Sequence, residues 1–65
     1  MTAEQAAIQF ILNSNETRVS RHGLYHAVKQ ATGKILSGSR EQLERIAQAV
    51  GGTYAINKRR GYIYR

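Results

Sequence analysis

The sequence predicts a small α+β domain in which three helices are followed by a C-terminal β-hairpin. Three stretches with helical hydrophobic periodicity each start directly after a hydroxyl residue that can cap a helix, namely Thr2, Ser20 and Ser39. Near the C-terminus, two short runs of strand-forming residues flank the turn-like segment 58–61. The chain has 65 residues, no proline and no low-complexity segment, so we expect one domain over residues 1–65.

The first helix is expected over residues 3–12. Thr2 and Gln5 have the spacing of a capping box at its start. Four apolar residues fall on one face of this helix, namely Ala3, Ala7, Phe10 and Ile11, and Ile8 and Leu12 widen that face. The segment 17–19, which is partly β-branched, can form a brief strand before the second helix.

The second and third helices are expected over residues 21–32 and 40–50. Gly33 is placed to end the second helix in a left-handed conformation. Two sets of apolar residues repeat at helical spacing and predict the buried faces: Leu24, Ala27, Val28 and Ala31, then Leu43, Ile46, Ala47 and Val50. The connection between these helices carries Ile35 and Leu36, which we expect to reach into the core.

The C-terminal hairpin is expected to turn at Arg59 and Arg60, with Gly61 at the positive-φ position of a bulge. This register places Ile56 opposite Tyr64. It also places the larger side chains on one face, which we expect to cover the helices: Tyr54, Ile56, Tyr62 and Tyr64.

The charge of the chain is positive and unevenly distributed. Ten Lys and Arg residues against four acidic residues give a net charge of +6, and no acidic residue follows Glu44. Lys58, Arg59 and Arg60 cluster at the expected turn, where side chains are most exposed. A rigid hairpin with cations at its tip suits a polyanion, and nucleic acid is the first candidate. The alternative is a solvated basic surface without a partner.

The order of helix, short strand, helix, helix and hairpin is similar to that of the winged helix-turn-helix superfamily. The resemblance covers nearly the whole chain and lies in the order of elements. It implies that the protein binds duplex DNA, with helix 40–50 in the major groove and a wing at 57–62 on the phosphates. Carried over to this sequence, it implies a recognition helix and a wing tip with the residues Arg40, Glu41, Arg45 and Gln48, and Lys58, Arg59 and Arg60.

The side chains of the third helix also match the chemistry of base edges without reference to a family. Arg45 can bind guanine bidentately, Gln48 can bind adenine, and Glu41 can accept a hydrogen bond from cytosine. These three residues share one helix face, which also fits a solvated surface with an ion pair between Glu41 and Arg45. Further candidates for phosphate contact, two of them at helix N-termini, are Arg18, Arg21 and Ser39.

No residue pattern indicates catalysis, a metal or a cofactor. The chain has no cysteine, and its four carboxylates do not define a pocket that could shift their pKa. His22 and His26 have a spacing that can bind zinc, but no further ligand lies near them in sequence. We therefore expect a protein that is not an enzyme and has no metal site and no cofactor.

These observations predict a DNA-binding protein, a transcriptional regulator or an accessory recombination factor of a bacterium, phage or plasmid. One alternative is binding of RNA or single-stranded nucleic acid through the tyrosine-bearing hairpin, with bases stacked on Tyr54, Tyr62 or Tyr64. Another is a protein-interaction or inhibitor module that uses the basic turn against an acidic partner protein.

The sequence also predicts the oligomeric state and the cellular location of the protein. Because so short a chain has a marginal core, we expect a homodimer, formed through Ile8 and Leu12 or through the free edge of the hairpin. The N-terminus lacks the features of a secretory signal, and no apolar run approaches the roughly 20 residues that span a membrane. We therefore expect a cytoplasmic protein without a membrane partner.

Overall fold

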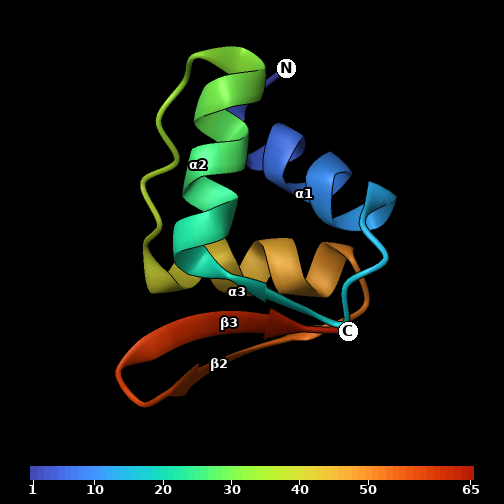
Figure 1. Ribbon diagram of the computed structural model, residues 1–65, viewed down its shortest axis with the longest axis vertical. Helices are drawn as coiled ribbons and strands as arrows, with labels where there is room; N and C mark the ends of the chain where they lie inside the picture. Colours follow the sequence, from blue (N-terminus) through green and yellow to red (C-terminus); the bar gives the residue numbers. More distant parts are fainter.

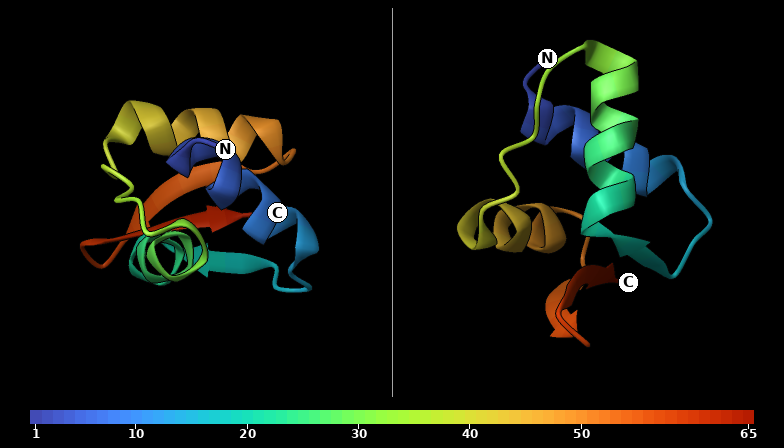
Figure 2. Two further views of the ribbon diagram at one scale, coloured as in Figure 1. Left: turned by 90° about the horizontal axis from the view of Figure 1, so that it is seen from above. Right: turned by 60° about the vertical axis from the view of Figure 1, so that its left-hand side comes forward.

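The chain folds into three helices packed on one face of a three-stranded antiparallel sheet (Figure 1). The computed structural model describes residues 1–65. Its elements follow the order α1 (Ala3–Asn13), β1 (Arg18–Ser20), α2 (Arg21–Thr32), α3 (Arg40–Ala49), β2 (Thr53–Asn57) and β3 (Arg60–Tyr64). The helices lie above the hairpin in Figure 1 and in the right-hand view of Figure 2, and the opposite face of the sheet carries no helix. The prediction of an α+β fold is confirmed.

The helices begin at the hydroxyl residues that the sequence marks as caps. Thr2 accepts a hydrogen bond from the Gln5 N–H at 3.1 Å, and the Gln5 side chain accepts one from the Thr2 N–H at 2.9 Å, so the predicted capping box is present. Ser20 and Ser39 each accept from the N–H three residues further on. Gly33 ends α2 with a φ of 72°, the left-handed conformation that was expected.

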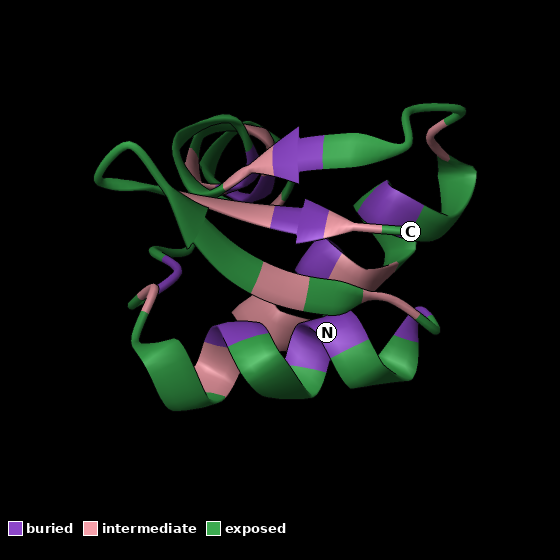
Figure 3. Cartoon of the chain, turned by 90° about the horizontal axis from the view of Figure 1, so that it is seen from below, coloured by how far each residue is buried: buried purple, intermediate pink, exposed green.

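The core lies between the helices and the inner face of the sheet, and all of its buried residues are hydrophobic. The predicted stripe of α3 is buried in full: Leu43, Ile46, Ala47 and Val50. From α2, Leu24 and Val28 are buried, whereas Ala27 is half-buried and Ala31 is exposed near the end of the helix. Figure 3 shows buried segments on the inner sides of the helices and an exposed hairpin turn.

The buried face of α1 is narrower than the sequence predicts. It is formed by Ala6, Ala7 and Ile11, while Phe10 is 42% exposed and Leu12 is 46% exposed. The expectation that Phe10 shares the buried face is therefore wrong, whereas the exposure of Leu12 agrees with its place at the margin of the predicted face. Small alanine side chains allow α1 to approach its neighbours closely, so the large residues beside and behind them are left at the margin or on the solvent side.

The connection between α2 and α3 enters the core at one residue only. Leu36 is 2% exposed and belongs to the core, as predicted, whereas its neighbour Ile35 is 66% exposed. The single residue Leu36 thus anchors this segment against the helices.

The hairpin turn lies one residue earlier than predicted. Lys58 and Arg59 are its central residues, with φ values of 52° and 67°, and Asn57 pairs with Arg60. A two-residue turn with positive φ at both central positions has the type I′ form, whose twist matches that of the flanking strands. The predicted turn at Arg59 and Arg60 with a bulge at Gly61 is therefore wrong.

The observed register makes Gly61 a strand residue and changes which tyrosines face the helices. Ile56 lies opposite Gly61 and not opposite Tyr64. A Cβ at Gly61 would come within 3.0 Å of ring carbons of Tyr54, so only glycine leaves room for that ring. Tyr54 packs against the core on the inner face, while Tyr62 and Tyr64 occupy the outer face of the sheet. The prediction that these tyrosines and Ile56 share one face that covers the helices is therefore wrong, and Ile56 itself is 62% exposed.

A third strand completes the sheet. The brief strand that the sequence allowed at 17–19 is present as β1, but its pairing with the hairpin was not predicted. β1 pairs with β3, so β3 is the central strand. Val19 lies opposite Ile63, and both are buried. A lone two-stranded hairpin is marginal in water, and this pairing gives the hairpin a covered edge. None of the helices has the length and apolar character that crossing a membrane requires.

Candidate nucleic-acid interface

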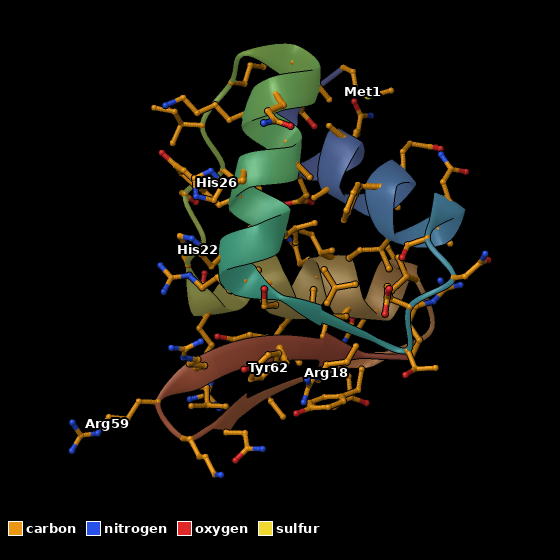
Figure 4. All side chains as sticks on the ribbon, in the orientation of Figure 1. Met1, Arg18, His22, His26, Arg59 and Tyr62 are labelled. Atoms are coloured by element: carbon orange, nitrogen blue, oxygen red, sulfur yellow. The ribbon has the colours of Figure 1, made fainter.

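The hairpin turn presents cations that have no acidic partner. Lys58, Arg59 and Arg60 are all exposed, and the structure contains two ion pairs, neither of which involves these residues. Figure 4 shows Arg59 pointing away from the body of the molecule at the end of the hairpin. These side chains are therefore free to contact an anion.

The first turn of α2 adds a further cation beside the hairpin. A groove of about 820 Å³ separates this turn from the α2–α3 connection and the hairpin, and Arg21, Arg59 and Arg60 are among its lining residues. No acidic residue lines it. The Arg21 side chain lies over Gly38, where a Cβ would be 2.8 Å from its Nε. We call the four residues Arg21, Lys58, Arg59 and Arg60 the cationic edge.

The exposed face of α3 differs from this edge because both of its arginines are paired with glutamates. Arg40 Nε lies 3.1 Å from Glu44 Oε1, one helical turn away. Arg45 Nη2 lies 2.9 Å from Oε1 of Glu4 on α1, so the ion pair between Glu41 and Arg45 that a solvated helix face would allow does not form. The hydrogen bonds that the Arg45 guanidinium donates to the Glu4 carboxylate, assisted by the charge of Glu4, raise the pKa of Arg45 above its ordinary value. The charged residues of α3 are two arginines, Arg40 and Arg45, and two glutamates, Glu41 and Glu44, so the helix carries no net charge.

The uncharged residues of the predicted interface lie at the two ends of α3. Gln48 is exposed in the last turn, and its side chain makes no hydrogen bond within the protein. The Ser39 hydroxyl accepts the Gln42 N–H at 3.2 Å and so serves as the cap of the helix. The Gln42 side chain accepts hydrogen bonds from the Ser37 hydroxyl and the Gly38 N–H, which fixes the start of α3 beside the groove.

Arg18 lies apart from the cationic edge and from α3. It is on the outer face of the sheet, and its guanidinium carbon is 4.8 Å from the centroid of the Tyr62 ring (Figure 4). The predicted site residues therefore divide among three surfaces: the cationic edge, the α3 face and the outer face of the sheet. The role of Tyr62 on that third surface depends on the register of the hairpin, which the sequence did not reveal.

The two histidines lie on α2 next to each other. The rings of His22 and His26 are 4.4 Å apart between centroids, in an edge-on arrangement (Figure 4). No group of three or more metal-ligating side chains occurs in the structure.

Comparisons of the chain with protein-family models, with curated proteins and with solved structures found no match. What can be inferred about function therefore comes from the geometry and charge of the chain itself.

Proposed function

We propose that the protein binds double-stranded DNA as a winged helix-turn-helix domain, with the hairpin turn on the phosphate backbone and α3 toward the major groove. The observation that carries the proposal is the cationic edge. Its four cations come from segments far apart in the sequence, have no acidic partner and sit on a short, rigid turn and a helix start. A phosphate backbone is the polyanion that such a surface fits. The order of the elements supports the same arrangement.

The two parts of this interface would contribute differently. The cationic edge supplies charge, which gives most of the affinity and no sequence preference. The face of α3 has no net charge, so it adds little to non-specific attraction. It exposes Glu41, Arg45 and Gln48, whose carboxylate, guanidinium and amide groups can bond base edges. Arg45 must exchange its bond to Glu4 for a base, which favours a correct sequence over a random one.

The biological role that fits a small binding domain of this kind is transcriptional regulation or assistance to recombination in a bacterium, phage or plasmid. A homodimer would place two such surfaces on neighbouring half-sites and so raise specificity. On α1, Leu12 remains exposed for such a contact, whereas Ile8 packs partly against the core.

The proposal is tested by fluorescence anisotropy with a random duplex of about 20 base pairs at several salt concentrations. The wild type is compared with a variant in which Lys58, Arg59 and Arg60 are changed to Ala. We expect salt-sensitive binding by the wild type, and a log–log salt slope that is shallower by up to about 2.7 in the variant, because each phosphate contact contributes about 0.9. Failure of the wild type to bind at low salt, or an unchanged slope, would contradict the proposal.

A further inference from the structure

The outer face of the sheet forms a second surface, which shares only Arg60 with the proposed duplex interface. The central strand β3 presents Arg60, Tyr62 and Tyr64 on this face, since Ile63 between them is buried on the other side. Arg18 of β1 lies opposite Tyr64 and so shares the face. No helix covers these residues (Figures 1 and 3).

Two aromatic rings lie at the centre of this face and remain accessible. The Tyr62 and Tyr64 rings are 6.1 Å apart between centroids and tilted by 50°. Their neighbours on β2 are small: Ala55 lies opposite Tyr62, and Thr53 lies opposite Tyr64. Small flanking residues leave the two tyrosines partly exposed, so flat groups from a ligand can reach the rings.

The charge of the face determines which ligand suits it. Arg18 packs its guanidinium against the Tyr62 ring, and Arg60 stands at the other end of the same row of side chains. No acidic residue lies on these strands. A second copy of the chain would bring arginine against arginine, which opposes self-association through this face. An anionic ligand with planar rings complements both the charge and the tyrosines.

We propose that the outer face of the sheet binds the unpaired nucleotides of single-stranded nucleic acid, with bases stacked on Tyr62 and Tyr64 and the backbone near Arg18 and Arg60. Bases within a duplex cannot reach such rings, whereas unpaired bases can. The 6.1 Å between the rings is nearly twice the rise of about 3.4 Å per nucleotide in a duplex strand, so successive bases fit only when the strand is extended.

This inference can be tested separately from duplex binding, because Tyr62, Tyr64 and Arg18 of the outer face belong neither to the cationic edge nor to the α3 face. A protein that binds both forms would contact a junction between duplex and single strand. The unpaired nucleotides can come from DNA or from RNA, which differ by the 2′-hydroxyl, and probes of both kinds distinguish the two sources.

The test is anisotropy with three labelled probes of about 12 nucleotides, a length within the site sizes of small single-strand-binding domains. The probes are oligo(dT), oligo(U) and an abasic strand with the same phosphates and no bases. Tyr62→Leu removes the ring, and Tyr62→Phe keeps it. We expect the wild type to bind oligo(dT) or oligo(U) more tightly than the abasic strand. We expect Tyr62→Leu to weaken this binding about tenfold and Tyr62→Phe to change it by less than about twofold.

Several results would overturn the inference. One is that the wild type binds the abasic strand as tightly as the oligonucleotides with bases. The others are no binding to oligo(dT) or oligo(U) at low salt, and an equal effect of Tyr62→Leu and Tyr62→Phe. If Tyr62→Leu does not fold, Arg18→Ala replaces it, with Lys29→Ala on the exposed side of α2 as the control for loss of charge. Arg18→Ala should then weaken oligonucleotide binding more than Lys29→Ala does. Duplex binding by the Tyr62 variants should stay unchanged, which distinguishes failure of this inference from failure of the proposed duplex function.

Discussion

The hairpin turn holds Lys58 and Arg59 in backbone conformations that favour asparagine and glycine. Changing these two residues to Asn and Gly should therefore raise the stability of the fold and weaken DNA binding. Their φ values of 52° and 67° lie in the left-handed region, which costs a residue with a Cβ about 1–2 kcal/mol. Asn followed by Gly is the preferred pair for this turn type. A strained turn that nevertheless carries two cations is best explained by a use for those cations.

The size of both effects can be estimated for Lys58→Asn combined with Arg59→Gly. Glycine removes the left-handed strain but loses about 0.5–1 kcal/mol more conformational entropy on folding, so the pair should gain about 1 kcal/mol in the free energy of unfolding. For a domain of this size, that raises the Tm by about 4–8 °C. The same change removes two cations, so the log–log salt slope of duplex binding should become shallower by about 1.8.

Thermal unfolding followed by circular dichroism and anisotropy against salt measure the two effects. The matched control is Lys29→Gln with Lys34→Gln, which removes the same charge near the far end of α2. We expect the control to keep most of the slope. Stabilisation with unchanged binding would refute phosphate contact by the turn, and weaker binding without stabilisation would refute the strain.

Two further predictions concern the core and the α3 face. Leu36→Ala should lower the free energy of unfolding by about 2–5 kcal/mol, because Leu36 is buried in the core. The adjacent exposed residue is the control, and Ile35→Ala should change the free energy by less than about 0.5 kcal/mol. Equal effects of the two variants in urea unfolding would mean that Leu36 does not anchor the connection to the core. Glu4→Gln releases Arg45 and should raise duplex affinity more than Glu16→Gln, which changes the net charge equally. Stability should change by less than about 1 kcal/mol, because the Arg45 side chain is 58% exposed and water screens the pair. Equal affinities of these two variants would show that Arg45 does not reach the DNA.

The helices and their caps could be predicted from the sequence because the signals are local. A hydroxyl residue before each periodic stretch and a glycine after α2 act within one turn of the chain. The register of the hairpin could not be predicted in this way. Gly61 looks like the turn residue, yet its lack of a side chain makes room for the ring of Tyr54 across the strands. That requirement exists only in the folded structure.

Only part of the candidate interface could be predicted, because some of its features are local in sequence and others depend on the fold. Exposed cations follow from their place at a turn, and the structure leaves Lys58 and Arg59 unpaired there. The partner of Arg45 is Glu4, which is 41 residues away in sequence, so no pattern of spacing along α3 could identify it. The exposure of Tyr62 likewise depends on pairing between strands, since a shift of one residue reverses every side chain between the two faces of a sheet.

The most direct test of duplex binding by the cationic edge is a titration of the ¹⁵N-labelled protein with a duplex of about 20 base pairs, followed by NMR chemical shifts. We expect the largest amide shifts at the hairpin turn, the first turn of α2 and the exposed face of α3. Shifts confined to α1 and the end of α2, or no shifts at low salt, would contradict the account.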